Sequence, residues 1–141
     1  MAHISRMFGI AAAATALLLA GTAAQARTHL TGEQQLAKLL EGRVAGKPVD
    51  CIYMPTVNGS TVIDKTAIVY DSGRTVYVQR PKVGADSLDD DDILVTELHS
   101  SQLCSIDTVQ LRDRNGHFWR GFVGLDKFVP YTKPAKVALA D

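Results

Sequence analysis

An apolar segment at the N terminus determines which part of this chain can fold and in which compartment it folds. Met7–Ala20 is a run rich in Ala and Leu, and Ala24-Gln25-Ala26 supplies the small residues that a signal peptidase requires. The run has about 14 residues, or roughly 21 Å as a helix, which is short of the ~30 Å hydrocarbon core of a bilayer. We therefore predict that residues 1–26 are a secretory signal peptide, cleaved near Ala26. The remaining chain is expected to be periplasmic or secreted, with no membrane span.

Two cysteines follow this segment, Cys51 and Cys104, and both have apolar neighbours. In an oxidising compartment such a pair usually forms a disulfide, and only one intramolecular pairing is available. Closing a loop of about 54 residues would stabilise the fold by on the order of 4 kcal/mol in the chain-entropy model. The alternative is a reactive thiol with His99 or His117 as its base, but neither cysteine has a nearby Lys, Arg or His in the sequence. We therefore predict a structural disulfide.

Length and charge indicate a single domain and argue against a protein that binds nucleic acid. The chain has 141 residues, which corresponds to a single domain. Lys plus Arg and Asp plus Glu each number 15, so the formal net charge is zero and no global field attracts nucleic acid. We expect one folded domain over residues 27–131 and a disordered tail over residues 132–141. We predict no nucleic-acid partner and no cofactor.

One helix is indicated, over residues 31–41. Thr31 is a suitable N-cap, and Gln34, three residues later, completes the pattern of a capping box. Gly42 is placed to end the helix in a left-handed conformation. Leucines at helical spacing form one apolar stripe between these ends: Leu36, Leu39 and Leu40.

From Val49 onward the sequence has the pattern of β-strands. The clearest hairpin pairs residues 67–70 with residues 75–79, and because both arms are apolar on both faces near the turn, we expect a central position in the sheet. A second hairpin pairs residues 108–112 with residues 117–123. Its turn contains Asn115-Gly116, which predicts positive φ at both turn residues.

The strand signals, about six or seven in all, show no alternation with helices, so the sheet should be mainly antiparallel. The acidic residues 86–92 are expected to form a polar loop before a strand over residues 93–98, and a last strand is expected over residues 128–131. We predict an α+β domain that is mostly β. Its architecture would be a small antiparallel twisted sheet or a partly open barrel, with one N-terminal helix.

The chain also resembles small exported proteins of uncharacterised function from alphaproteobacteria. The resemblance covers residues 36–133 and is carried mainly by three segments, Gly42–Ile52, Asp89–Thr96 and Ser101–Asp107. It implies export and a single domain, and it implies no activity.

One tripeptide matches a catalytic signature. Asp71-Ser72-Gly73, after an apolar stretch, is similar to the D-[ST]-G loop of aspartic peptidases, in which two carboxylates share a proton to activate water. A chain of this length would have to dimerise to supply the second carboxylate. Arg74 follows the glycine where that family usually has a small residue, and a cation there opposes the sharing of a proton. Asp-Ser-Gly is also a common hairpin turn, which is the interpretation we favour.

Two further groups have suitable residue types without the required spacing. Asp89–Asp92 offers carboxylates to Ca²⁺, but neighbours in an extended backbone point to alternate sides, so at most two converge. His99-Ser100-Ser101 together with Asp107 includes the residue types of a hydrolase triad, but no G-x-S-x-G elbow accompanies them. We therefore predict no catalytic residue and no metal site, and interpret the aspartates as a solvated loop.

The second hairpin carries a cluster of basic and aromatic residues: Arg112, Arg114, His117, Trp119 and Arg120. Such a cluster fits an anionic partner, whether a carboxylate on peptidoglycan, a phosphate on lipopolysaccharide or an acidic protein face. In the alternative interpretation Trp119 belongs to the core and the arginines are solvated. Strand alternation places Trp119 on one face and Phe118 with Arg120 on the other.

These features predict an exported, non-enzymatic domain with a binding or structural role in the bacterial cell envelope, whose partner the sequence does not identify. A dimeric aspartic-type peptidase using Asp71 is the alternative.

Overall fold

The computed structural model describes residues 29–135. The predicted signal peptide, residues 1–26, and the predicted tail from residue 136 onward lie outside these residues. No helix within the described part has the length and apolar content needed to cross a membrane. In chain order the elements are α1 (Gly32–Leu39), β1 (Val44–Ala45), β2 (Cys51–Tyr53), a 3-10 turn (Met54–Thr56), β3 (Gly59–Ile63), β4 (Ala67–Ser72), β5 (Thr75–Gln79), a 3-10 turn (Ala85–Ser87), β6 (Asp92–Thr96), β7 (Gln102–Cys104), β8 (Thr108–Asp113), β9 (Trp119–Gly124) and β10 (Phe128–Thr132).

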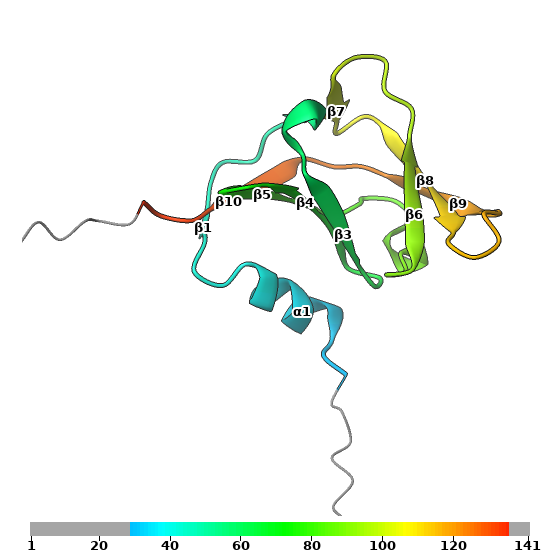
Figure 1. Ribbon diagram of the computed structural model, residues 1–141, viewed down its shortest axis with the longest axis horizontal. Coiled ribbons are helices and arrows are strands. Elements are labelled where there is room, and N and C mark those ends of the chain that lie inside the picture. The colour runs from blue at the N-terminus through cyan, green and yellow to red at the C-terminus, as the bar shows by residue number, and fades with distance from the viewer. Residues whose placement is uncertain (1–28, 136–141) are drawn as a thin grey trace, which may run out of the picture.

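The strands form two antiparallel sheets and a short ladder (Figure 1). The larger sheet has the order β1-β10-β5-β4-β3, the smaller one has the order β6-β8-β9, and β2 pairs with β7. The predicted α+β, mostly β fold with antiparallel strands and one N-terminal helix is confirmed. The β4–β5 hairpin lies inside the larger sheet, as its apolar arms predicted, because each arm has a strand on both sides.

Two stretches of chain join the two sheets, residues 80–91 between β5 and β6 and residues 125–127 between β9 and β10, and the second of these is the shorter. β9 ends the smaller sheet at Gly124, and after a short connection β10 enters the larger sheet at Phe128. Leu125 and Phe128 are fully buried at this crossing. On the opposite side β3 and β6 are the last strands of their sheets, and no ladder joins them. The two sheets therefore surround a common core without closing into a barrel, and we call the gap between β3 and β6 the seam.

Apolar side chains from both sheets fill the space between them. Within this core the ring of Tyr70 meets that of Phe128 edge to face, with centroids 6.0 Å apart. Burial raises the pKa of the Tyr70 phenol, which has no hydrogen-bond partner among residues 29–135. The buried members of the core are Ile52, Val62, Ile68, Tyr70, Leu88, Leu103, Val109, Leu111, Val123, Leu125 and Phe128.

Helix α1 covers the other face of the larger sheet. The predicted capping box is present, since Gln34 N–H donates to Thr31 Oγ1 at 3.3 Å and Thr31 N–H donates to Gln34 Oε1 at 2.9 Å. Gly42 has a φ of 71°, as its place after the helix predicted. Leu36 is buried against the sheet, in a cluster with Ile63, Ala67, Val69, Val76 and Val78.

Cys51 and Cys104 form a disulfide and are direct cross-strand partners in the β2–β7 ladder. On either side of them, Ser105 N–H donates to Asp50 O at 2.7 Å and Met54 N–H donates to Ser101 O at 3.0 Å. The cysteines therefore occupy a non-hydrogen-bonded position, where facing side chains are closest, and their Cα atoms are 4.0 Å apart. A three-residue ladder is too short to be stable alone, so the disulfide fixes it.

Three details differ from the sequence-based predictions. Asn115 and Gly116 do not have positive φ; the left-handed residue of that loop is His117, with a φ of 56°. The Asp113 carboxylate accepts both the Asn115 and the Gly116 N–H groups, so the turn is organised around an aspartate. The strand predicted at residue 93 begins at Asp92, which is buried. β10 runs one residue past the predicted domain end, to Thr132.

Replacing both cysteines by alanine should lower the free energy of unfolding by on the order of 4 kcal/mol, because a closed loop of this length is lost from the unfolded chain. Urea unfolding of the oxidised protein and of the Cys51→Ala/Cys104→Ala variant measures the difference. A reductant should move the midpoint of the parent protein and leave that of the variant unchanged. Equal midpoints for the parent and the variant would contradict the assigned role.

Candidate functional site

The outer face of the smaller sheet is the candidate site. In β8 the side chains of Val109 and Leu111 are fully buried, so the alternate residues Thr108, Gln110 and Arg112 point to the opposite side. Two aromatic residues of β9 join them, and together these residues form what we call the open face: Thr108, Gln110, Arg112, Trp119 and Phe122.

A β-bulge brings the two aromatic side chains together. Trp119 and Phe122 are three residues apart, and in a regular strand they would lie on opposite faces. The register pairs Leu111 with Gly121 but Arg112 with Trp119, so Arg120 is the extra residue. Trp119 and Phe122 consequently line one shallow hollow of approximately 350 Å³ with Thr108 and Gln110. Trp119 is 60% exposed and Phe122 is 50% exposed, so Trp119 is not a core residue.

The bulge also brings the Arg120 guanidinium against a buried carboxylate, while the Arg120 side chain stays 31% exposed. Its guanidinium forms a short ion pair with Asp92, whose side chain is completely buried, and it lies 3.8 Å from the Asp89 carboxylate. The hydrogen bond to Asp92 raises the pKa of Arg120, so the cation persists at every working pH. Arg120, predicted as part of an interaction surface, is therefore engaged in an ion pair within the smaller sheet. Asp92, predicted to be solvated, is its partner because a buried carboxylate requires a counter-charge.

The structure divides the rest of the predicted cluster between the open face and the hairpin loop. Arg112 lies on the open face and donates from Nη1 to His117 O at 3.4 Å. Arg114 and His117 are exposed in the loop, and Arg114 Nε lies 3.4 Å from Asp91 Oδ1. Trp119 is on the open face and Arg120 is not. Sequence reasoning missed Gln110 and Phe122, although the polar–apolar alternation of residues 108–112 is a signal for the first of these.

A second hollow of approximately 190 Å³ extends the open face at its other end. Glu97, His99 and Ile106 line it together with Thr108 and Gln110. Ile106 is 86% exposed, which gives this end an apolar projection. The carboxylates of Glu97 and Asp107 make the same end acidic, whereas Arg112 lies toward the other end.

Asp107 and Ser100, which have residue types found in a hydrolase triad, accept backbone hydrogen bonds instead. Asp107 Oδ2 accepts the Cys104 N–H at 2.7 Å, and Ser100 Oγ accepts the Gln102 N–H at 3.2 Å. Both side chains thus satisfy backbone donors at the ends of β7.

Asp71 lies at the tip of the β4–β5 hairpin. Its carboxylate accepts the Gly73 N–H at 2.7 Å, and Gly73 has a φ of 75°. This is the turn geometry that Asp-Ser-Gly commonly adopts. The placement favours the turn interpretation and gives no support to the peptidase alternative.

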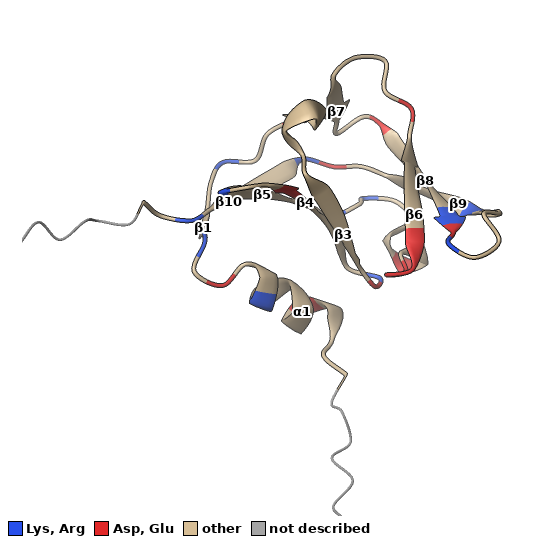
Figure 2. Cartoon of the chain, in the orientation of Figure 1, with Lys and Arg blue, Asp and Glu red and all other residues tan. Residues whose placement is uncertain are grey.

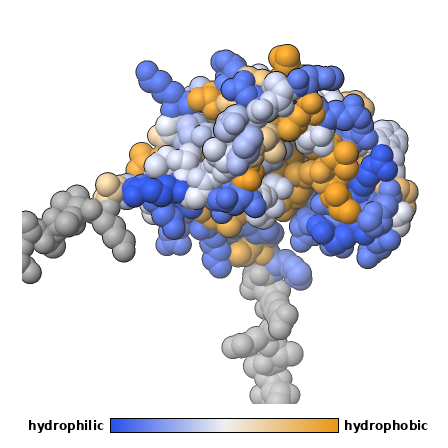
Figure 3. Space-filling view, turned by 45° about the horizontal axis from the view of Figure 1, so that its top comes forward, coloured by the Kyte–Doolittle hydropathy of each residue, from blue (hydrophilic) through white to orange (hydrophobic). Residues whose placement is uncertain are grey.

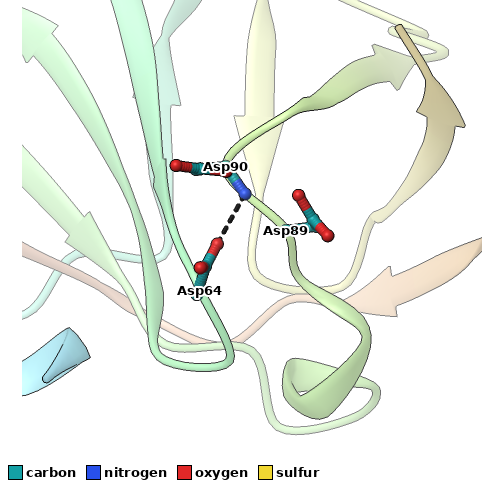
Figure 4. A group of neighbouring side chains, drawn as sticks. All are labelled: Asp64, Asp89 and Asp90. Atoms are coloured by element: carbon teal, nitrogen blue, oxygen red, sulfur yellow. Dashed lines mark hydrogen bonds between the residues drawn. The ribbon is translucent and has the colours of Figure 1, made fainter. Parts of the chain in front are cut away.

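Three carboxylates gather at the lower end of the seam, and Figure 4 shows them. Oxygens of Asp64, Asp89 and Asp90 lie within 4.8 Å of one another, and Asp90 N–H donates to Asp64 Oδ1 at 2.6 Å. The Asp64 carboxylate, together with smaller contributions from Asp89 and Asp91, raises the pKa of Asp90. Asp89 and Asp90, two of the four consecutive aspartates, thus lie close to Asp64, which belongs to the turn between β3 and β4. Ca²⁺ takes about six to eight oxygens, and one oxygen from each of these three side chains lies within 4.8 Å of the others.

Comparisons of the chain with protein-family models, with curated proteins and with solved structures give no match. The resemblance to small exported alphaproteobacterial proteins therefore stays a prediction.

Arg120→Ala should lower the urea midpoint clearly, because the buried Asp92 carboxylate loses its counter-charge. Arg114→Ala is the matched control, since it removes an exposed pair with Asp91 of the kind that contributes little to stability. Chemical denaturation of the three proteins measures the effect. Equal midpoints for the two variants would show that the Arg120–Asp92 pair contributes no more than a surface pair.

Asp90→Asn should raise the free energy of unfolding at pH 7, because it removes repulsion from Asp64. A carboxyl whose folded pKa is raised binds more protons when folded, so its presence costs stability as the pH rises above its ordinary value of 3.8. The gain should vanish at pH 3, where the carboxyl is protonated in both states. Urea unfolding at both pH values measures it, and a variant less stable than the parent at pH 7 would contradict this account.

Proposed function

We propose that this protein is an exported, non-enzymatic domain that binds a carboxylate-bearing glycan of the cell envelope, of the peptidoglycan type, through the open face. One observation carries the proposal: Trp119 and Phe122 are exposed side by side on the face of a sheet. The corresponding face of the larger sheet is covered by α1. Exposed paired aromatics are costly unless a partner covers them, and such residues are enriched where partners bind.

The chemistry of the open face matches a sugar chain. The flat rings of Trp119 and Phe122 offer apolar surface to the C–H faces of sugar rings. Between and beside them, the Gln110 amide provides donors and an acceptor, and the Thr108 hydroxyl provides one of each. These are the groups that hydroxyl and acetamido substituents require. Arg112, at one end of the face, fits a single carboxylate in bidentate geometry.

The charge distribution favours an isolated carboxylate over a dense array of phosphates. Arg112 is the cation of the open face, while Glu97 and Asp107 lie at its opposite end. Arg120 does not add to the positive charge, because it is paired with Asp92. A lipid surface rich in phosphate would be attracted by several cations on one side and repelled by these carboxylates.

Two features support export to the envelope. Residues 1–26 have the pattern of a signal peptide. The Cys51–Cys104 disulfide is typical of a protein that folds in an oxidising compartment.

Co-sedimentation with purified peptidoglycan sacculi tests the proposal. The Trp119→Ala/Phe122→Ala variant should bind roughly tenfold or more weakly, because central aromatic residues dominate such interfaces. Phe118→Ala is the matched control, since Phe118 is equally exposed but does not line the hollow of the open face. Sacculi whose carboxyl groups have been amidated should bind more weakly, and that loss should be absent in Arg112→Gln.

Two results would contradict the proposal. One is equal binding of sacculi by the parent protein and the double variant. The other is stronger binding to lipopolysaccharide vesicles than to sacculi, which would assign the open face to phosphate instead.

A further inference from the structure

The seam between the two sheets is a cleft lined by two strand edges. It has a volume of approximately 470 Å³, and its walls are Ser60–Val62 of β3 and Asp92–Leu94 of β6. β3 pairs only with β4, and β6 pairs only with β8, so each strand presents a free edge of backbone N–H and C=O groups toward the cleft. In Figure 1 these two strands lie side by side and diverge from their lower ends.

Hydrogen bonds at the lower end hold the two edges in place. Asp90 N–H donates to Asp64 Oδ1 at 2.6 Å, and Lys65 N–H donates to Leu88 O at 3.1 Å. These bonds tie the turn that follows β3 to the loop that precedes β6. Because Leu88 and Ile63 are buried beside them, the tie is anchored in the two cores, and the cleft is preformed.

The walls of the seam are mixed in character, with three apolar residues among polar ones and an acidic lower end. Val62, Ile93 and Leu94 line it, and Figure 3 shows hydrophobic surface on the side of the molecule that holds β3 and β6. Asp90 also lines the seam, beside Asp64 and Asp89, and Figure 2 shows acidic residues gathered at the lower end of β6. The one cation among the lining residues, Arg114, is paired with Asp91.

We propose that the seam accepts one extended peptide segment of a partner protein, with basic side chains. The segment pairs with β3 on one side and β6 on the other, and joins the two sheets into a continuous one. Main-chain hydrogen bonds to both edges supply affinity, as in other proteins that bind a partner by strand addition. Alternate side chains reach the apolar residues of the walls, and a lysine or arginine at one end reaches Asp90 and Asp64.

The dimensions indicate a short segment. Three residues of each wall line the cleft, which corresponds to roughly 10 Å of extended chain. This site shares no residue with the open face, so it does not depend on the proposed glycan binding.

Fluorescein-labelled peptides of sequence Lys-Val-Lys-Val-Lys, blocked at both ends, test the proposal by fluorescence anisotropy with the full folded protein. The lysine peptide should bind, and the matching Glu-Val-Glu-Val-Glu peptide should not. Two versions N-methylated at odd or even residues each lose the N–H groups that face one edge, so both should bind more weakly. Amide chemical shifts should change at residues 60–62 and 92–94, and not at Trp119 or Phe122.

Asp90→Asn should weaken binding of the lysine peptide by up to about fivefold, the range expected for one exposed charge pair. Asp71→Asn is the matched control, because Asp71 is also an exposed aspartate in a hairpin and its amide can still accept the Gly73 N–H. Equal binding of the lysine and glutamate peptides would overturn the choice of a basic partner. Strand addition would be overturned by unchanged binding after N-methylation, or by amide chemical-shift changes confined to the open face. It would also be overturned if the protein formed a dimer in which the amide shifts of the seam change without peptide.

Discussion

The passage of the chain from β9 to β10 is the constraint on which the rest of the structure depends. Because this short stretch ends the smaller sheet and then enters the larger one, it holds β9 and β10 together on one side of the core. Leu125 and Phe128 are buried at the crossing, and Gln79 adds a polar link there, since its side chain accepts the Asp126 N–H and donates to Asp126 O. On the opposite side no ladder joins β3 to β6, and hydrogen bonds link only the turn after β3 to the loop before β6, so the seam follows from that asymmetry.

The two sheets also differ in whether their outer faces are covered. The larger sheet is covered by α1, whose capping box and leucine stripe place Leu36 in a second apolar cluster. The smaller sheet keeps its outer face in contact with solvent, and this face carries the two exposed aromatic residues. A domain of this size buries a limited fraction of its surface, so leaving one sheet face uncovered forgoes stability that a second helix would supply. Binding a partner is a physical reason for that arrangement.

Local patterns in the sequence were sufficient to predict the helix and the β4–β5 hairpin, but they were insufficient to predict the open face and the seam. The capping box, Gly42 and the β4–β5 hairpin depend on neighbouring residues, and the structure confirms all three. The bulge at Arg120 depends on contact between distant strands, because the guanidinium pairs with the buried Asp92. Strict alternation therefore could not place Phe122 beside Trp119. The seam could not be predicted either, because the sequence of β3 or of β6 does not indicate that the two strands are left unpaired with each other.

The bulge has a further consequence for the behaviour of the protein in solution. β9 is an edge strand with two exposed aromatic side chains, an arrangement that invites chains to stack edge to edge. An extra residue interrupts the regular spacing of backbone donors and acceptors along that edge, and its charged side chain is paired with Asp92. Fibril-like growth requires an unbroken edge, so the same distortion that gathers the aromatic rings also limits polymerisation.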